Sequence, residues 1–415
     1  MRPRLHFTAA QGWLNDPHGL TYHDGVYHLF HQAVPGSLEW RPHCSWGHAT
    51  SPDLLTWSHR AAALSPGDGD DGVWSGTLVV DDDRARILYT SVSHPELGVG
   101  RVRVASPASD AWDAWTKGDV VARAPAGLDL VAFRDPFVRR EAGGWRMFVG
   151  AGSRDEVAMV LTYTSTDLES WEYDGVAASR SSHDTEPSWT GAVWECPQLV
   201  EVDGHWVLIV SVLGDDVIQH VGYGIGGRDS YREGRFTPSD WQPLVFGESY
   251  YAPSLFRDRD GRPSLVFWMR DVGDEAEGWT GCLSMPCLVS ARGGRLVLEP
   301  HPEVTARRGR PVAAGEVSST LDLEWTPAAD GDELILDSEE GPSASIRVAH
   351  GLVSLVRPGH DSWSMPWSGS ALRVVVDGPV LEICCPDGVL GGAIAPATTW
   401  RPVSGRATAW ELQPV

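Results

Sequence analysis

The chain has 415 residues, with 45 Gly, 29 Pro and 20 Trp, and a formal net charge of −23 at pH 7. This length is enough for two domains with sizeable cores, and the turn-forming and aromatic content suits an all-β globular protein rather than a disordered chain. The negative charge, with no basic stretch to offset it, argues against nucleic acid and anionic membranes as partners and in favour of a neutral or cationic ligand.

Short apolar segments that read as strands recur along the first two thirds of the chain, each after a turn-forming cluster. They occupy residues 25–30, 86–89, 144–148, 204–209 and 263–268. A second repeated element, clearest in residues 50–57 and 164–171, lies about twenty residues further on. Five copies at this period, with no long amphipathic helical pattern between them, predict a five-bladed β-propeller.

The repeat ends near residue 300, and residues 301–311 are polar and Arg-rich, as is typical of a linker. Short alternating strands follow at residues 334–336, 344–348, 352–356, 372–376 and 380–383. Their spacing and their Gly and Asp-Gly turns predict a β-sandwich. We therefore expect a propeller over residues 1–300, a linker over 301–311 and a sandwich over 312–415.

The six cysteines lack the CxxC pairs and the His spacing that are typical of zinc sites; they are Cys44, Cys196, Cys282, Cys287, Cys384 and Cys385. We expect reduced, mostly buried thiols, with the last two on opposite faces of one strand. The N-terminus has no apolar run of secretory length, and no stretch of about 18 apolar residues is present to span a membrane. These features predict a cytoplasmic protein.

Three acidic residues fall at one phase of the repeat: Asp16 before Pro17, Asp135 before Pro136, and Glu195 in Glu195-Cys196-Pro197. If one repeat is one blade, all three meet at one end of the central channel. Two flanking carboxyls can cleave a glycosidic bond while a third holds sugar hydroxyls or stabilises positive charge at the anomeric carbon. Turn formation explains any one of them equally well, but three in phase favour a site.

At these residues the chain resembles glycoside hydrolase family 32, the invertases, fructanases and related β-fructosidases. Residues 12–19 (Gly-Trp-Leu-Asn-Asp-Pro-His-Gly) are similar to the family's NDPNG motif, Arg134-Asp135-Pro136 to its RDP motif, and Glu195-Cys196 to its EC motif. Further similar positions are Gln32, Trp40, residues 46–49, 74–76, 251–253 and 279–281, and the C-terminal pattern Leu381-Glu382-Ile383 with Asp387-Gly388. The resemblance thus covers nearly the whole chain.

The resemblance implies that Asp16 is the nucleophile, Glu195 the general acid/base and Asp135 a transition-state stabiliser bonded to fructosyl hydroxyls. The substrate-binding residues that it implies are Asn15, Gln32, Trp40, Trp74, Ser75, Arg134, Cys196 and Tyr251. Glu195 must begin protonated, and neighbouring carboxyls would raise its pKa, whereas Asp16 could stay ionised by accepting hydrogen bonds.

The predicted function is hydrolysis of terminal β-D-fructofuranosyl residues from sucrose or short fructo-oligosaccharides. The mechanism would be retaining, through a covalent fructosyl-enzyme intermediate, with the two carboxyls about 5 Å apart. Carboxyls alone carry this chemistry, so we expect no metal and no organic cofactor, and a small carbohydrate as the only ligand.

Three positions depart from the family pattern: His18 replaces the usual Asn, Gln198 the usual Asp, and Cys287 follows Met285-Pro286 where an Arg is common. We expect altered specificity rather than lost activity. Fructosyl transfer, or another fructan-specific reaction, remains an alternative because transfer and hydrolysis deglycosylate the same intermediate. An inverting arabinanase or xylosidase-type propeller and a non-catalytic fructan-binding propeller are further alternatives, which the motifs and the three carboxyls argue against.

Overall fold

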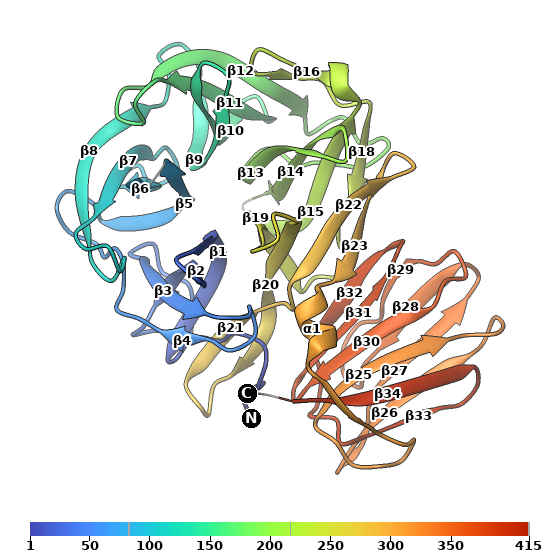
Figure 1. Ribbon diagram of the computed structural model, residues 1–415. Helices are drawn as coiled ribbons and strands as arrows, with labels where there is room; N and C mark the ends of the chain where they lie inside the picture. Colours follow the sequence, from blue (N-terminus) through green and yellow to red (C-terminus); the bar gives the residue numbers. More distant parts are fainter. Residues whose placement is uncertain (82–83, 216, 414–415) are drawn as a thin grey trace.

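The computed structural model describes residues 1–81, 84–215 and 217–413. In this part of the chain the only helices are α1 (Pro302–Ala306) and the 3-10 helix η1 (Arg228–Ser230), and most of the remainder is strand. Figure 1 shows a ring of sheets with a separate pair of stacked sheets beside it. The predicted all-β class, with a propeller followed by a sandwich, is confirmed.

The ring consists of antiparallel strand groups that follow one another in chain order. The first group contains β1 (Gly12–His23), β2 (Val26–Val34), β3 (Ser45–Ser51) and β4 (Ser58–His59), and the second contains β5 (Gly72–Asp81), β6 (Arg84–Val92), β7 (Arg101–Pro107) and β8 (Trp115–Arg123). The third contains β9 (Leu130–Glu141), β10 (Gly144–Ser153), β11 (Val157–Ser165) and β12 (Glu172–Ser181), and the fourth contains β13 (Val193–Val202), β14 (His205–Gly214), β15 (Val217–Gly226) and β18 (Asp240–Pro243).

The last group of the ring contains β19 (Tyr250–Arg257), β20 (Pro263–Asp274), β21 (Trp279–Leu283), β22 (Cys287–Arg292) and β23 (Arg295–Pro300). Both β21 and β22 pair with β20, each along a different part of it. A small hairpin, β16 (Tyr231–Arg232) with β17 (Arg235–Phe236), lies outside these groups. The five-bladed prediction counts each of the five groups as one blade.

The segments that the sequence predicts as strands are the second strands of their groups, namely β2, β6, β10, β14 and β20. The first strands, β1, β5, β9, β13 and β19, lie nearest the centre of the ring in Figure 1. Because the acidic motifs are on first strands, the fold brings them to the central axis.

The second repeated element forms the same turn twice. Asp53 Oδ1 accepts hydrogen bonds from the backbone of Leu55 (2.9 Å) and Thr56 (2.7 Å), and Asp167 Oδ1 accepts the equivalent pair from residues 169 and 170. Leu54 and Leu168 follow with positive φ angles of 69° and 67°. A side chain that satisfies its own local backbone explains why the pattern recurs where a strand ends.

The ring closes at its N-terminal strand. The start of β1 pairs in parallel with β21, with Gly12 opposite Trp279 and Trp13 opposite Thr280. The Gly12 amide also donates to the Gly278 carbonyl at 2.8 Å. Gly281 must be glycine here, because its φ is +87° and a Cβ atom would lie 2.0 Å from the Leu14 carbonyl oxygen.

The sandwich consists of two sheets. One contains β24 (Arg308–Pro311), β34 (Arg406–Leu412), β25 (Thr320–Thr326), β30 (Leu372–Asp377), β31 (Val380–Cys385) and β32 (Gly388–Ala393); the other contains β29 (Trp363–Pro366), β28 (Leu352–Val356), β27 (Gly341–Ala349), β26 (Glu333–Ser338) and β33 (Thr399–Pro402). Within the expected linker, α1 leads into β24, which pairs with β34 of the sandwich. The domain boundaries remain a prediction.

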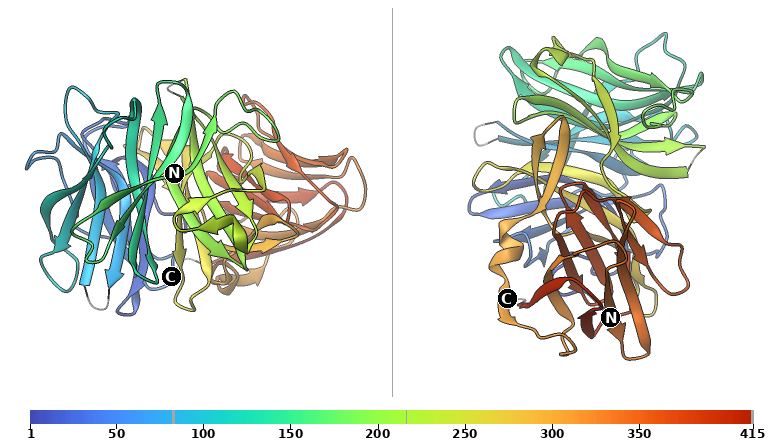
Figure 2. Two further views of the ribbon diagram at one scale, coloured as in Figure 1. Left: turned by 90° about the horizontal axis from the view of Figure 1, so that it is seen from above. Right: turned by 90° about the vertical axis from the view of Figure 1, so that its right-hand side faces the viewer.

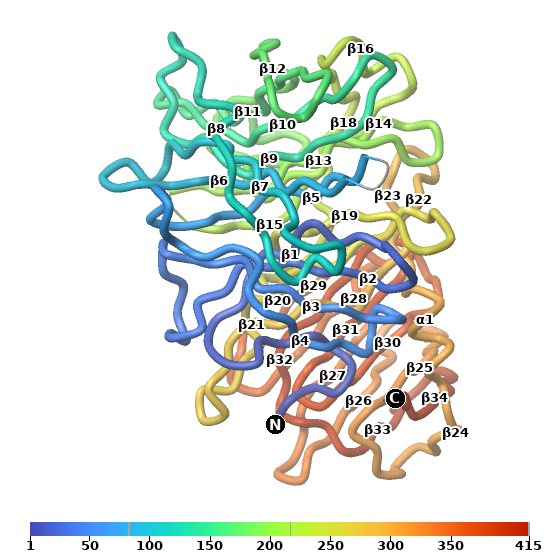
Figure 3. The backbone as a smooth tube through the Cα atoms, turned by 60° about the vertical axis from the view of Figure 1, so that its left-hand side comes forward, coloured from blue at the N-terminus to red at the C-terminus, as the bar shows by residue number. Residues whose placement is uncertain are grey.

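The sandwich packs against the last strand group of the ring, as the views from above and from the side in Figure 2 show. The Phe246 amide donates to the Val389 carbonyl at 3.1 Å, and Cys384 Sγ contacts the Leu298 carbonyl at 3.1 Å. The N-terminal segment and the last described strand, β34, both lie in the lower half of Figure 3, and Leu5 and Leu412 share one hydrophobic cluster. The two domains therefore form a continuous packed body.

All six cysteines are free, and Cys384 and Cys385 belong to different hydrophobic clusters, as expected for opposite strand faces. Within the described residues, no helix is long and apolar enough to cross a membrane.

Candidate active site

Every first strand of the ring is irregular at the same level. The pairing register with the second strand shifts between Asn15 and Pro17, Trp74 and Gly76, Arg134 and Phe137, Glu195 and Gln198, and Tyr251 and Ser254. Four residues at these bulges have positive φ angles: Asp16 (23°), Asp135 (58°), Cys196 (46°) and Ala252 (41°). Bulges re-aim side chains, and residues held in this rarely populated region gather at functional sites.

The bulges correct one expectation from the sequence. Asp16, Asp135, Cys196 and Ala252 are equivalent, each with positive φ and each followed by proline. Glu195 lies one residue earlier and is equivalent to Asn15 and Arg134, so the three acids do not share one phase. The site consequently has two levels: one with Asp16, Ser75, Asp135 and Cys196, and a second with Asn15, Trp74, Arg134, Glu195 and Tyr251.

Asp16 ends a relay of buried polar side chains. Ser75 Oγ donates to Asp16 Oδ2 at 2.7 Å and accepts from Gln32 Nε2 at 2.6 Å. Asn15 Nδ2 donates to Gln32 Oε1 at 3.2 Å, and the Trp13 indole donates to Asn15 Oδ1 at 2.8 Å. The relay fixes the Ser75 hydroxyl so that its proton points at Asp16.

Asp135 is held mainly through its backbone and one carboxyl oxygen. Oδ2 accepts from Arg134 Nε at 2.9 Å and from the Cys196 amide at 3.0 Å, while the buried Oδ1 has no partner. The Cys196 thiol lies between two acids, 3.9 Å from Asp16 Oδ2 and 3.7 Å from Asp135 Oδ2. Thr90 joins the strands beneath, because its hydroxyl accepts from the Asp135 amide at 2.7 Å and donates to the Ser75 carbonyl at 2.8 Å.

Glu195 is bound on both carboxyl oxygens. Arg134 Nη1 contacts Oε1 at 2.8 Å, so one guanidinium bridges Asp135 and Glu195. The Tyr251 hydroxyl lies 2.7 Å from Oε2 and 3.0 Å from the Val212 carbonyl. Tyr251 can therefore donate to an ionised Glu195, or accept from a protonated one while it donates to Val212.

An aromatic pair continues the site toward solvent. The Arg134 guanidinium carbon lies 4.6 Å from the centre of the Trp74 ring, and Trp74 meets Trp40 edge to face at 5.6 Å. Trp74 is buried and fixed by its indole bond to the Pro42 carbonyl at 2.8 Å, whereas Trp40 is 40% exposed. The structure thus joins all eleven predicted site residues through a connected set of contacts.

Burial dominates the electrostatics of the site. It raises the pKa of Glu195, helped by Asp135 and opposed by Arg134 and Tyr251. It also raises the pKa of Asp16, again helped by Asp135 and opposed by the hydrogen bond from Ser75. Burial disfavours the charge of Arg134, but Asp135 and Glu195 outweigh it and raise its pKa, so Arg134 remains a cation. Two buried carboxyls with raised pKa values around one cation form a site in which few charges can coexist.

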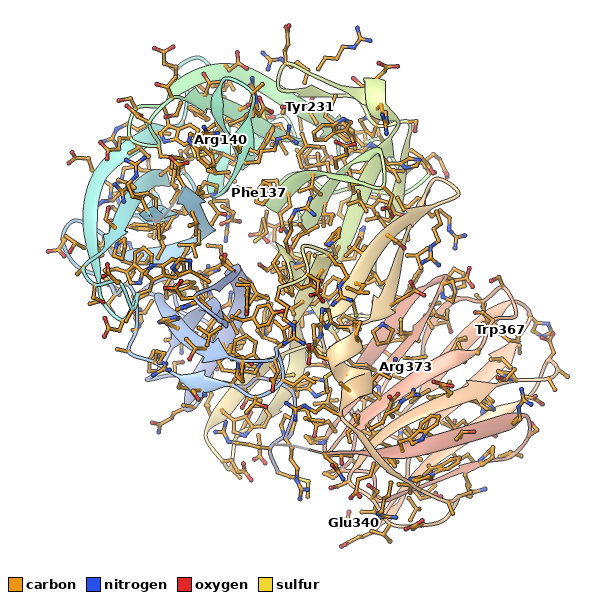
Figure 4. All side chains as sticks on the ribbon, viewed as in Figure 1. Phe137, Arg140, Tyr231, Glu340, Trp367 and Arg373 are labelled. Atoms are coloured by element: carbon orange, nitrogen blue, oxygen red, sulfur yellow. The ribbon has the colours of Figure 1, made fainter. Side chains whose placement is uncertain are left out.

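A cavity lies next to the carboxyls, along the first strands of the ring. This cavity of about 780 Å³ has Ser75, Asp135 and Cys196 in its wall, and Phe137 projects toward this central space in Figure 4. His18 also lines it and packs on Trp46 with ring centroids 3.9 Å apart. Burial holds the pKa of His18 well below its usual value, so it is neutral. His18, which stands where the family motif usually has Asn, is therefore a packing residue behind the carboxyls.

Gln198 and Cys287 are the other two residues that depart from the family pattern, and the side chains of both make their contacts away from the three acids. The Gln198 amide donates to the Pro253 carbonyl at 2.6 Å and accepts from the Leu255 amide at 2.7 Å, so it connects β13 to β19. Cys287 is buried near the Met285 carbonyl. Among the described residues, no cluster of three or more His, Cys, Asp and Glu side chains is arranged to hold a metal ion.

Three further residues support the site without being among the predicted site residues: Trp13, Gln198 and Thr90. The sequence places Trp13 in the motif of residues 12–19 and marks Gln198 as a departure from the family pattern, whereas Thr90 belongs to neither group. Thr90 is on β6, and only its pairing opposite Trp74 brings it to the site.

Comparison with known proteins settles the family. The model of the glycosyl hydrolases family 32 N-terminal domain matches residues 6–300. The chain belongs to glycoside hydrolase family 32. Among its curated family 32 relatives, a sucrose-6-phosphate hydrolase of Escherichia coli is 32% identical over 330 residues and a raffinose invertase of Escherichia coli is 33% identical over 330 residues. Each match covers 74% of this chain and 66% of the relative, slightly less than two thirds of its length.

Solved structures of family 32 enzymes match nearly the whole fold. A β-fructofuranosidase of Bombyx mori superposes with a TM-score of 0.87 and 26% identity, covering 99% of this chain and 94% of that one. The fold of fructan 1-exohydrolase IIa from Cichorium intybus is also similar, with a TM-score of 0.83 and 21% identity over 99% of this chain and 97% of that one.

Proposed function

We propose that the protein is a retaining glycoside hydrolase that cleaves terminal β-D-fructofuranosyl residues from sucrose or short fructo-oligosaccharides. The observation that carries the proposal is the convergence of Asp16, Asp135 and Glu195, from three bulged strands, around the single cation of Arg134. Membership of family 32 and the names of the relatives, a sucrose-6-phosphate hydrolase and an invertase, support the substrate class.

In the first step, Asp16 attacks the anomeric carbon of the fructosyl unit while Glu195 gives its proton to the departing glycosidic oxygen. Ser75 and Cys196 both contact Asp16 Oδ2, which leaves Oδ1 as the attacking oxygen. The C–O bond to the leaving group breaks, an ester bond to Asp16 forms, and the proton leaves with the released alcohol.

In the second step, a water molecule attacks the same carbon, Glu195 takes a proton from it, and the ester bond breaks to release fructose and restore the Asp16 carboxylate. Burial, Asp135 and the charge of Asp16 raise the pKa of Glu195, in that order, while Arg134 and Tyr251 oppose them. Because esterification removes that charge, the pKa of Glu195 falls when it must act as a base. Tyr251 stabilises the carboxylate at this stage by donating to Oε2.

Asp135 would hold the fructosyl unit. Its Oδ1 is buried without a donor, and buried polar atoms in native proteins are normally paired. A fructosyl hydroxyl would supply the missing hydrogen bond, and Oδ2 would stay fixed by Arg134 and the Cys196 amide.

The test compares the wild type with Asp16→Ala on sucrose, sucrose 6-phosphate, a β-2,1 and a β-2,6 fructo-oligosaccharide, and an arabino-oligosaccharide. Loss of the nucleophile should lower fructose release at least about 10³-fold. Asp24→Asn, a change at an exposed residue in the turn after β1, is the matched control and should keep full activity. Chromatography that separates fructose from longer products distinguishes hydrolysis from transfer.

Retention is tested by adding methanol as the acceptor, because a methyl fructoside does not mutarotate. Carbon NMR should show the β-anomer alone. The α-anomer would contradict the covalent mechanism, and a wild type that turns over none of the fructosides would contradict the proposed function itself.

A further inference from the structure

Strand β19 contacts both the candidate acid/base and the C-terminal sandwich through neighbouring tyrosines. Tyr251 Oη lies 2.7 Å from Glu195 Oε2, and Tyr250 Oη donates to Glu382 Oε2 at 2.9 Å. Glu382 is on β31 of the sandwich. Successive side chains of a strand point to opposite sides, so one strand joins the two sites, and both tyrosines are almost fully buried.

We propose that Tyr250 and Glu382 are positioning residues. Through them the sandwich holds β19 in the position in which the Tyr251 hydroxyl reaches Glu195. The inference rests on the proposed function, because it takes Glu195 as the acid/base. It gives a role in the reaction to the Leu381-Glu382-Ile383 motif of a domain without catalytic groups of its own.

The position of β19 along the ring axis depends on contacts from outside its own sheet. As the innermost strand of its group, β19 has a ladder partner on one side only, β20. That ladder pairs Tyr250 with Met269 and Tyr251 with Trp268, and it is interrupted directly beyond them, between Tyr251 and Ser254. The two tyrosines therefore stand at the end of a paired segment, where side-chain contacts add to the backbone pairing.

Glu382 is a rigid anchor for this purpose. Its Oε1 accepts from the Met285 amide at 2.7 Å and from His6 Nε2 at 2.8 Å, so the N-terminal segment, the ring and the sandwich all meet at one carboxylate. A second anchor lies just before the strand: Ser249 bonds to Asp271, which accepts from Arg357 Nη1 and the Ala393 amide of the sandwich at 3.1 Å each.

Different ionisable groups surround Glu195 and Glu382, the two carboxyls that β19 connects. Those facing Glu195 are Asp16, Arg134, Asp135, Cys196 and Tyr251. Those facing Glu382 are His6, Tyr250, Cys282, Cys287, Cys384 and, more distantly, Arg373 and Asp377. A change at Tyr250 therefore reaches Glu195 only through β19 and Tyr251.

The experiment measures kcat, KM and the pH profile of kcat/KM for Tyr250→Phe, Tyr251→Phe and the double variant. Removing one hydroxyl should cost about two- to tenfold in kcat/KM, carried by kcat with KM nearly unchanged. The alkaline limb should move to higher pH in each single variant, because the bond from Tyr251 holds the pKa of Glu195 down. The double variant should match Tyr251→Phe alone.

Arg295→Gln is the control for looser domain packing. It removes a pair between the ring and the sandwich, Arg295 to Asp387 at 2.9 Å, without touching β19. It should leave the pH profile unchanged. A shift of the pH profile in Arg295→Gln as large as that in Tyr250→Phe, or additive shifts in the double variant, would overturn the coupling between Tyr250 and Glu195. If Tyr250→Phe fails to fold, Glu382→Gln tests the same contact from the side of the sandwich.

A titration of Glu195 by carboxyl carbon NMR, assigned by its loss in Glu195→Gln, needs no turnover. If the wild type cleaves no fructoside, the proposed function fails, yet an upward move of the Glu195 titration in Tyr250→Phe still supports the coupling. An unmoved titration refutes the coupling whatever the activity.

Discussion

Ser75 shows how a single hydroxyl prepares the candidate nucleophile. It can donate only one hydrogen bond, and the bond that it accepts from Gln32 Nε2 leaves its proton for Asp16. Gln32 is oriented in turn by Asn15. The relay therefore favours an ionised Asp16 in a place where burial and Asp135 favour the neutral form.

Ser75→Ala should lower kcat/KM about 10- to 100-fold, the value of a hydrogen bond to a charged group. It should also move the acidic limb of the pH profile to higher pH. The sign follows because the Ser75 bond lowers the pKa of Asp16, so its loss lets burial raise that pKa further.

Thr77→Val is the matched control, since it removes another buried hydroxyl two residues along β5 that touches none of the carboxyls. Its profile should overlay that of the wild type. An acidic limb that stays in place in Ser75→Ala would mean that Asp16 is not the group that must be ionised.

At the scale of the strand, the bulges decide what the sequence could predict. The five second strands and five of the sandwich strands, β26, β27, β28, β30 and β31, are visible in the sequence as apolar segments between turns, and the acids are visible as motifs. The offset of Glu195 is hidden when the three acids are aligned with one another, and it becomes visible when Pro17, Pro136 and Pro197 are aligned instead. Glu382 stands in a motif of the sequence, but its contact with Tyr250 could not be predicted, and neither could the contact of Thr90 with Asp135, because only pairing and packing between distant segments bring these residues together.

Gly76 tests the importance of the bulge in β5. A Cβ atom at this position would lie 2.1 Å from the Leu88 carbonyl oxygen and 2.7 Å from Tyr89 Cα, both of which are backbone atoms that cannot turn aside. We expect Gly76→Ala to destabilise the protein by about 1–3 kcal/mol and to reduce activity by displacing Ser75. Denaturant midpoints and fructose release measure the two effects.

Gly143 offers the comparison, because a Cβ atom there meets nothing within 4 Å and its φ is unstrained. Gly143→Ala should leave activity unchanged and stability equal or slightly higher. If both glycine variants behaved alike, close strand packing at Gly76 would not control the site.

At the scale of the whole molecule, the N-terminal segment joins the two domains. Asp377 of the sandwich accepts from the backbone of Arg4, Leu5 and His6, and the His6 ring bridges Asp377 and Glu382 at 2.8 Å each. Burial opposes a charged imidazole, but the two carboxylates outweigh it and raise the pKa of His6 to about 9. A buried cation thus neutralises part of the charge where the domains meet.

This linkage predicts how stability depends on pH. Because the folded pKa of His6 lies above the unfolded value of 6.5, its contribution is complete below pH 6.5 and is lost as the pH rises through about 9. The full contribution is about 3 kcal/mol. His6→Gln should therefore lower the unfolding midpoint most at pH 6.5, and its difference from the wild type should close toward pH 10. The control is His360→Gln, which changes an exposed histidine and should leave the unfolding midpoint at the wild-type value at every pH. A gap that stayed constant with pH would show that His6 acts through packing alone, and the charge balance between its two carboxylates would then have no part in joining the domains.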